Sequence, residues 1–410
     1  MLIRSTTADD LGIFIDTLHT AFGQFPQTPL DAGGRWWSAL EMDRALLALT
    51  PQTQPVGTAA AYSFELTLPG QNVVPVSGVS AVSVVPTHRR QGVLTALMRH
   101  QLTQLRARGD FLAVLLASEA PIYGRFGYGP ATYTTELSIT HQHSPLAPPR
   151  ASTPEPGSIQ VLRRDAAQDL IEDLYDRYRR TQPGALSRPH SWWTRQSGQP
   201  PISPAPRYIA LHRNRDGEPT GYASYALEGQ TLTVDEIITT DSINSTGSST
   251  VATFTALARF VLGHDLVSTV VLKHVPPHHP LRWQLHDFRA GKVIDDTDWL
   301  WVRLLDIPRA LAARGWSGDG DLVLEVQDPF LNEHARYLLS VREGNAECFP
   351  TDREADLSLD VRDLGSLYLG GTTPSTLVQA GHIHAHHPQA AARADDLFRT
   401  PGAPHCLHWF

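Results

Sequence analysis

The sequence predicts two successive α/β units followed by a smaller α+β unit. Residues 1–140 and 158–300 show the same order of strand-like and helix-like segments, which favours a repeated α/β layer architecture. Between them, residues 141–157 combine many prolines with no hydrophobic periodicity, as is typical of a linker. From 301 to 410 the order changes to short alternating strands and short helices. The shared order supports an internal duplication, although the residues of the two units do not match.

Hydrophobic spacing defines the elements of the first unit. After the capping candidate Thr7, apolar residues recur at helical intervals, which predicts a first helix. A second helix, later in this unit, is expected to end at Gly109. The run FLAVLLAS is short and mostly apolar, so it favours a strand buried on both faces. The expected elements are a helix over 7–22, strands over 56–68 and 74–86, a helix over 87–109 and a strand over 111–118.

The same reasoning applies to the rest of the chain. In the second unit, a turn at Asp216–Gly217 predicts a hairpin. Its expected elements are a helix over 166–181, the hairpin over 207–227, a strand over 231–240, a helix over 248–263 and a strand over 266–275. In the third unit we expect strands over 320–330, 335–344 and 355–364, and short helices over 373–383 and 389–400.

Composition narrows the class of protein. The formal net charge is −8 and no basic face is visible, which argues against a nucleic-acid partner. Two cysteines, Cys348 and Cys406, are too few for a disulfide framework or a cysteine-based zinc site. The N-terminus lacks the apolar stretch of a signal peptide, and no run of about 18 apolar residues could span a bilayer. We therefore expect a cytoplasmic protein with no membrane partner.

A histidine-rich run at 382–387, HIHAHH, raises the question of a metal site. His382, His384 and His386 alternate, and imidazole is a good ligand for zinc or nickel. However, no carboxylate or cysteine cluster stands at a fixed spacing from them, and the run lies at a predicted helix edge. We expect solvated or capping histidines and no metal.

The segment that carries chemistry lies at 80–102, SAVSVVPTHRRQGVLTALMRHQL. A strand ends at Pro86, and Arg89, Arg90, Gln91 and Gly92 form a turn that opens a helix. Unpaired N–H groups at a helix start bind anions such as a pyrophosphate, and arginines add charge-assisted contacts. The alternative is an ordinary strand–turn–helix with two solvated arginines.

Two sequence blocks resemble known acetyltransferases. The pattern V-x-P-x-x-R-R-x-G-x-L resembles the acyl-CoA pyrophosphate loop of GCN5-related N-acetyltransferases (GNAT), with Leu94 where glycine or alanine is usual. The block SE-x-x-IYGRFGYGPAT at 118–132 resembles the enhanced intracellular survival (Eis) family. The layout is also similar to that family: an active GNAT domain at 1–140, a linker, a degenerate GNAT-like domain at 158–300 and a sterol-carrier-protein-like domain at 301–410.

The resemblance implies an N-acetyltransferase that uses acetyl-CoA as co-substrate and a primary amine, aminoglycoside-type or other, as acceptor. Tyr123 matches the family's proton donor, with Tyr128 as a second candidate and a core aromatic as the alternative for Tyr123. A phenol suits protonation of a departing thiolate. The implied acetyl-CoA site comprises Val82, Ser83, Val84, Arg90, Gln91, Gly92, Val93, Leu94, Thr95, Ser118 and Glu119. The second domain lacks the turn, so we expect no acetyl-CoA there.

The catalytic base is harder to find. The strand before the turn, 78–86, contains no acid or histidine; Glu65 is the nearest acid on the preceding strand, and His88 is better placed as an anion contact. The resemblance implies a different base, the α-carboxylate of Phe410. The aromatic side chains of Trp409 and Phe410 would then anchor the segment that carries it.

Aromatic segments predict the walls of the substrate pocket. Because these segments carry few acids, a more apolar amine is a candidate besides an aminoglycoside. The expected substrate-binding residues are Phe22, Gln24, Trp36, Trp37, Glu65 and Trp409. The family also implies a homo-hexamer. The alternative function is a non-enzymatic lipid-binding or scaffold protein that uses the sterol-carrier-like domain.

Overall fold

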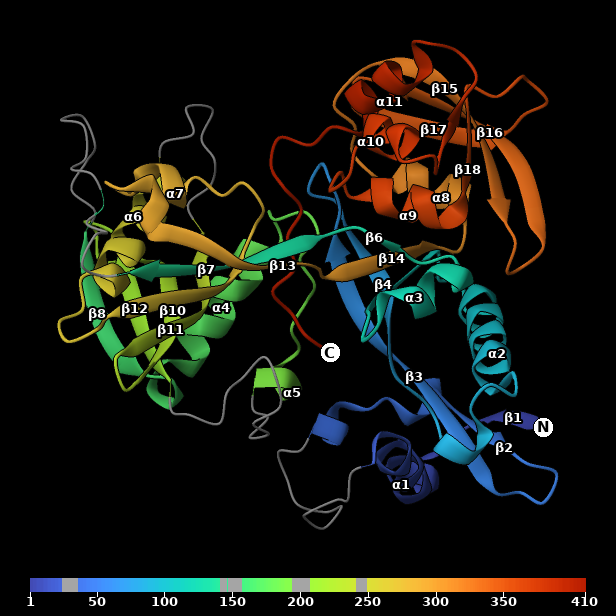
Figure 1. The fold of residues 1–410 in the computed structure, drawn as a ribbon, viewed down its shortest axis with the longest axis horizontal. Helices are drawn as coiled ribbons and strands as arrows, with labels where there is room; N and C mark the ends of the chain where they lie inside the picture. Colours follow the sequence, from blue (N-terminus) through green and yellow to red (C-terminus); the bar gives the residue numbers. More distant parts are fainter. Residues whose placement is uncertain (24–35, 141–145, 147–156, 194–206, 241–248) are drawn as a thin grey trace.

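The protein contains three β-sheets with helices packed against them, as a computed structural model shows (Figure 1). In Figure 1 the first domain is blue to teal, the second is green to yellow on the left, and the third is orange to red at the upper right. The structure describes residues 1–23, 36–140, 146, 157–193, 207–240 and 249–410. In this part of the chain no helix is long and apolar enough to cross a membrane.

The first sheet has seven strands in the order β1-β2-β3-β4-β5-β14-β6. Its strands are β1 (Leu2–Ser5), β2 (Ala45–Leu49), β3 (Pro55–Thr67), β4 (Val73–Val84), β5 (Leu112–Leu116), β14 (Leu300–Leu304) and β6 (Gly129–Pro130), and its helices are α1 (Leu11–Phe22), α2 (Val93–Ala107) and α3 (Ala120–Tyr123). Leu47 of β2 packs with α1, whereas its neighbour Leu46 packs with α2. Because successive strand residues point to opposite faces, α1 and α2 cover opposite faces of this sheet.

The second sheet also has seven strands, in the order β13-β7-β12-β11-β10-β9-β8. Its strands are β8 (Ser158–Arg163), β9 (Tyr208–Arg213), β10 (Pro219–Glu228), β11 (Thr231–Thr239), β12 (Thr269–Val275), β7 (Tyr133–Thr140) and β13 (Gly291–Asp298), and its helices are α4 (Gln168–Arg179), α5 (His190–Trp193), α6 (Ser249–Leu262) and α7 (Leu281–Gln284). The hairpin predicted over 207–227 is present as β9 and β10, which pair antiparallel.

The third sheet has five strands in the order β17-β16-β15-β18-β19. Its strands are β15 (Gly320–Asp328), β16 (Glu333–Arg342), β17 (Asn345–Pro350), β18 (Leu357–Asp360) and β19 (His384–Ala385), with helices α8 (Ile307–Ala313), α9 (Val361–Tyr368), α10 (Pro374–Gln379) and α11 (Ala390–Phe398). The strand predicted over 355–364 was wrong in its second half. The side chain of Asp360 accepts from the Arg362 N–H and so starts α9, whose apolar residues follow helical spacing.

The first two domains exchange strands. Strand β7 leaves the first domain and pairs with β12 and β13 in the second sheet. Strand β14, which follows β13 of the second sheet directly in the chain, returns to the first sheet and lies between β5 and β6. The expected boundaries at 140 and 300 therefore do not separate the two sheets.

The segment 404–410 passes between the domains (Figure 1). The His405 N–H donates to the carbonyl of Pro183 at 2.8 Å, and Leu407 packs into a core cluster of the second domain. Cys406 and Phe410 belong instead to a core cluster that residues of the first and third domains share. This segment is therefore buried against all three domains although it forms neither helix nor strand.

Candidate active site

The first sheet opens between its two central parallel strands. Strands β4 and β5 pair only at Ser77 with Ala113 and at Gly78 with Val114, after which they separate. Beyond these pairs the facing edges carry backbone N–H and C=O groups that the other strand does not satisfy. An extended ligand with amide groups can pair with them in place of a strand.

A β-bulge shapes the free end of β4. Thr58 pairs with Ser83 and Ala60 pairs with Ser80, so β4 carries one extra residue, and Ala81 has a φ of 50°. The Thr58 hydroxyl donates to the Ala81 carbonyl at 2.7 Å and also lies 2.7 Å from the Ser83 hydroxyl. These contacts fix the bulge and occupy the side chain of Ser83.

The turn after β4 has the geometry of an anion site. Arg90 and Gly92 have φ values of 62° and 81°, and α2 begins at Val93 with no side-chain cap. The N–H groups of the first turn of α2 are therefore available to an anion, in the favourable field of the helix dipole. In the described part of the chain, the Arg90 side chain makes no hydrogen bond or ion pair.

The neighbouring arginine has a structural contact. The Arg89 guanidinium donates to the carbonyl of Ala21 at 2.6 Å and to the carbonyl of Val84 at 3.3 Å. It therefore ties the turn to the end of α1. Because Arg89 is engaged in this way, Arg90 is the better candidate to contact a bound phosphate group.

A cavity of about 730 Å³ joins the opened strands, the turn and α3. Almost all of the expected acetyl-CoA residues line it: Val82, Ser83, Val84, Arg90, Gly92, Val93, Leu94, Thr95, Ser118 and Glu119. Gln91 does not, because its amide turns back to the Thr87 carbonyl at 3.1 Å. Ala21, Ile122 and Arg125 also line the cavity. No motif in the sequence marks these three residues, and the only signal for Ile122 and Arg125 is their proximity to Tyr123.

Tyr123 lies on α3 at the cavity wall and is 8% exposed. Burial raises the pKa of its phenol, and a hydrogen bond with Ser118 offsets part of that rise. The phenol is thus protonated at neutral pH and can act as a proton donor. Tyr128 is fully buried and does not line the cavity; its ring centroid lies 6.3 Å from that of Tyr123.

Phe410 docks beside the point where β4 and β5 separate. Its ring packs against Phe64 at a centroid distance of 5.1 Å and against Tyr62 at 6.5 Å. A Cβ atom on Gly78 would lie 3.0 Å from the Phe410 ring and 2.5 Å from the Phe64 ring. The absence of a side chain at Gly78 therefore creates the space in which these two rings lie.

The other expected substrate residues are dispersed. Phe22 is exposed at the cavity wall, whereas Trp37 is buried, with its ring centroid 6.0 Å from that of His19. Glu65 lies off the cavity wall and pairs with Arg179 at 2.8 Å. Trp409 is half-buried. Gln24 lies outside the described residues, as does the Trp36 side chain, although Trp36 begins a short 3-10 helix, Trp36–Ala39.

The histidine run has ordinary polar contacts. The His382 ring lies 3.0 Å from the Asp363 carboxylate, and the His386 ring lies 2.7 Å from the Ser358 hydroxyl. Within the ranges that the structure describes, no group of three or more histidine, cysteine, aspartate or glutamate side chains could hold a metal ion.

Comparison with known proteins places the chain among the acetyltransferases. Residues 2–131 match one acetyltransferase (GNAT) domain family, residues 184–304 match another, and residues 307–407 match a sterol carrier protein domain family. The chain is thus an N-acetyltransferase with tandem GNAT domains and a sterol-carrier-like third domain. This confirms the fold class that the sequence predicts.

The chain belongs to the Eis family of N-acetyltransferases. It is 33% identical to N-acetyltransferase Eis of Mycobacterium bovis over 361 residues, covering 85% of this chain and 84% of the relative. An uncharacterized N-acetyltransferase of Streptomyces avermitilis is 37% identical over 358 residues, covering 87% of this chain and 86% of the relative. The crystal structure of Eis1 from Mycobacterium abscessus superposes with a TM-score of 0.84 at 32% identity, over 100% of both chains.

Proposed function

We propose that the protein transfers the acetyl group of acetyl-CoA directly to a primary amine of a small molecule, with Tyr123 as general acid and the Phe410 α-carboxylate as general base. The main support is the cavity in which the separated strands, the anion-binding turn and the buried Tyr123 phenol meet. These three features match the three parts of the co-substrate: an amide-containing arm, a pyrophosphate and a thioester.

Each part of acetyl-CoA has a place in this cavity. The pyrophosphate lies at the start of α2, where unpaired N–H groups and Arg90 provide donors and positive charge. The amide-containing arm pairs with the open edge of β4, at Val82 and Val84. The thioester then lies toward Tyr123.

Tyr123 supplies the proton that the departing thiolate needs. The amine attacks the acetyl carbonyl, the C–S bond breaks, and the sulfur takes a proton from the phenol. Because the pKa of the buried phenol is raised, it carries its proton at neutral pH and cannot act as a base before the reaction. Tyr128 is a weaker candidate because it does not line the cavity.

The attacking amine must lose a proton, and the Phe410 carboxylate is our candidate acceptor. Phe410 is buried beside Gly78, where β4 and β5 separate. Neither Phe410 nor Glu65, the alternative from the sequence, lines the 730 Å³ cavity, but the Glu65 carboxylate is already held by Arg179, whose side chain is 5% exposed.

Two acids near the expected amine-binding residues, Glu41 and Glu65, are already engaged by other side chains. Both carboxylate oxygens of Glu41 accept hydrogen bonds from Ser63, and Glu65 is paired with Arg179. These acids are therefore engaged, which favours an amine with an apolar body over a polycationic aminoglycoside, although both remain acceptors to test. From the family we also propose a homo-hexamer and a cytoplasmic location.

The decisive experiment compares the native C-terminus with blocked ones. Intact mass first identifies the terminal residue, and thiol release from acetyl-CoA is then measured with a panel of primary amines. Deleting Phe410 or adding a C-terminal tag should lower kcat by about 10²–10⁴-fold, since a general base contributes about that much. Acetyl-CoA binding should stay within about twofold of wild type. An N-terminal tag is the matched control, and full turnover with a blocked C-terminus would exclude the terminal base.

The alternative, lipid carriage by the third domain, has less support. A cavity of about 370 Å³ in this domain is lined mainly by polar side chains, among them Asp360, Arg362 and His382. An apolar lipid would gain little there. Extraction of the purified protein with organic solvent, followed by mass spectrometry, tests this alternative: a stoichiometric lipid together with no thiol release for any amine would favour it over the acetyltransferase.

A further inference from the structure

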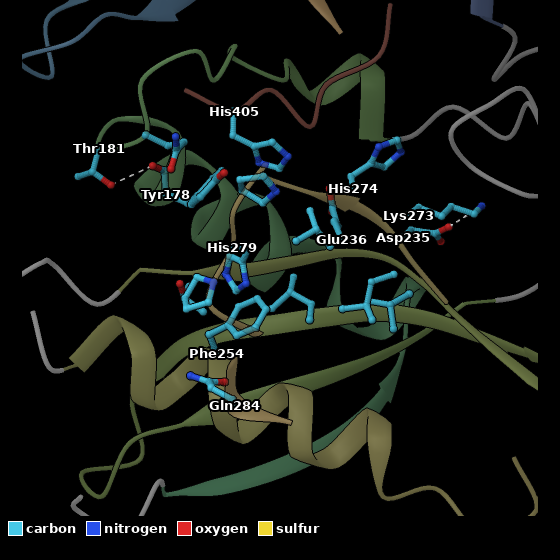
Figure 2. A pocket seen from close by; sticks show the side chains of 18 of the residues that line it. Tyr178, Thr181, Asp235, Glu236, Phe254, Lys273, His274, His279, Gln284 and His405 are labelled. Carbon is cyan, nitrogen blue, oxygen red and sulfur yellow. Dashed lines mark hydrogen bonds and ion pairs between the residues drawn. The ribbon is translucent and has the colours of Figure 1, made fainter. Parts of the chain in front are cut away.

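The second domain has an opening like that of the first. Strands β11 and β12 run parallel and pair from Thr231 to Val234, and from Thr269 to Leu272, after which they separate. A cavity of about 460 Å³ lies at this separation, shown in Figure 2. It occupies the position that the acetyl-CoA cavity occupies in the first domain.

The walls of this cavity are largely apolar. Phe254 of α6 lies on one side, and its ring centroid is 4.3 Å from that of His279. Other apolar side chains come from the two strands and the segment after β12: Val234, Ile237, Leu272, Val275 and Pro276. A ligand with an apolar body of a few carbon atoms can be buried here with a gain of about 25 cal/mol per Å² of apolar surface.

Three imidazoles enter the cavity from separate segments (Figure 2). His405 comes from the segment 404–410 and is 3% exposed, and its Nε2 atom has no hydrogen-bond partner in the described part of the chain. The buried Nδ1 atom of His274 on β12 likewise lacks a partner there. The third imidazole is that of His279, in the segment between β12 and α7. Buried polar atoms without partners are uncommon in folded proteins, so these two point to a ligand that supplies a hydrogen-bonding group.

The carboxylates at the cavity are already paired, which argues against a cationic ligand. Glu236 is already bound by Arg188 at 3.1 Å and by the Tyr222 hydroxyl at 2.6 Å. A cationic amine would therefore find no unpaired acceptor at Glu236.

The second carboxylate is engaged in the same way. Asp235 is bound by Arg207 and, at 3.1 Å, by Lys273, which also lines the cavity. Each of the two carboxylates is thus paired with at least one cation, so neither is available to a cationic ligand.

We propose that this cavity binds a small monocarboxylate with an apolar body. The carboxylate is received by the imidazoles of His405 and His274, and the body lies against Phe254 and the apolar strand residues. The site is distinct from the acetyl-CoA cavity, and its occupancy does not depend on the proposed function of Tyr123 or Phe410.

Binding of such an anion should be coupled to proton uptake. In the ligand-free protein, burial lowers the pKa of His405 to about 3 and those of His274 and His279 to about 4. The other titratable or charged groups that face these rings are Asp235 and Glu236 of β11, Lys273 of β12, Tyr178 of α4, and Arg188. A bound carboxylate would raise the imidazole pKa values, so affinity should increase as the pH falls toward about 5.

Calorimetry with defined probes tests the proposal. Benzoate and hexanoate are titrated into the full chain without acetyl-CoA, at several pH values from about 5.5 to 8 and in two buffers of different ionisation enthalpy. We expect one site, up to about a tenfold gain in affinity per pH unit and uptake of up to one proton. The uncharged benzamide should bind at least about tenfold more weakly, and benzylamine should not bind.

Two substitutions test whether the carboxylate binds in this cavity. His405→Gln should weaken benzoate binding at least about tenfold and remove most of the proton uptake, and Phe254→Ala, at a half-buried position, should weaken binding without changing the proton uptake. The matched control is the exposed His384→Gln in the third domain, which should bind as wild type. The proposal is overturned if neither carboxylate binds saturably, if benzamide or benzylamine binds equally well, or if both cavity variants bind as wild type.

Discussion

Replacing Gly78 with alanine should impair turnover more than acetyl-CoA binding. The added methyl group would lie 2.5 and 2.6 Å from two atoms of the Phe64 ring and 3.0 Å from the Phe410 ring. Carbon atoms pack at about 3.5–4.0 Å, so Phe64 must move by about 1 Å and Phe410 by about 0.5 Å. The Phe64 ring is itself enclosed by Trp192 and His408, at centroid distances of 5.8 and 5.2 Å, so the displacement passes on to the segment that carries Phe410.

The expected losses of stability and of turnover follow from these displacements. Overpacking a buried site costs about 1–3 kcal/mol in the free energy of unfolding. A shift of about 1 Å in a catalytic group can cost about 10²-fold in rate, so we expect kcat to fall about 10–100-fold. Gly78 does not line the acetyl-CoA cavity, so the Kd for acetyl-CoA should change by less than about twofold.

The assay combines steady-state kinetics, calorimetric acetyl-CoA binding and urea unfolding. Gly402→Ala is the control, since this glycine is in the same C-terminal region and no atom of the described residues lies within 4 Å of the new methyl position. It should leave all three measurements unchanged. The reasoning fails if Gly78→Ala loses stability as expected but keeps wild-type kcat, because the position of Phe410 would then not matter. An equal loss in acetyl-CoA affinity would instead indicate damage to the first cavity.

Three further predictions test the first cavity and the buried imidazoles. Arg90→Ala should raise the Kd for acetyl-CoA about 10–100-fold through loss of a charge-assisted contact, and an unchanged Kd would remove Arg90 from the phosphate site. Tyr123→Phe should lower kcat by about 10²–10⁴-fold with little effect on acetyl-CoA binding, and wild-type turnover would refute its role as acid. The lowered pKa values of His274, His279 and His405 mean that the unfolded chain binds more protons below pH 6.5. As the pH falls from 6.5 to about 4, each imidazole should therefore lower the free energy of unfolding by up to about 1.4 kcal/mol per pH unit. Urea unfolding at several pH values measures this slope. An equal slope in wild type and His405→Gln would contradict the prediction.

The strand–turn–helix around Arg90 could be predicted from the sequence because its information is local. Arg90, Gly92 and the start of α2 are contiguous, and a strand, a turn and a helix start suffice to place N–H groups and charge together. Tyr123 follows from a short contiguous block in the same way. The orientation of a single side chain within the motif is not predicted in this way: the amide of Gln91 turns back toward the Thr87 carbonyl and not into the cavity.

The strand exchange could not be predicted, because periodicity identifies a strand but not its partner. Residues 133–140 and 300–304 have ordinary strand patterns, and nothing in them indicates that each pairs in the other domain's sheet. The ion pair of Glu65 could not be predicted for a similar reason: its partner, Arg179, is 114 residues away in the sequence. Long-range pairings of this kind decide whether an acid is available, and they become visible only in the folded chain.

The position of Phe410 depends on all three domains together. Leu407 is held in a second-domain core cluster, and its carbonyl accepts from Arg188 at 3.4 Å. Cys406 and Phe410 pack into the core that the first and third domains share. Because this segment forms no helix or strand, its conformation depends on such tertiary contacts. The degenerate second domain and the sterol-carrier-like domain therefore contribute to catalysis, under the proposed mechanism, by holding one residue beside the separated strands of the first.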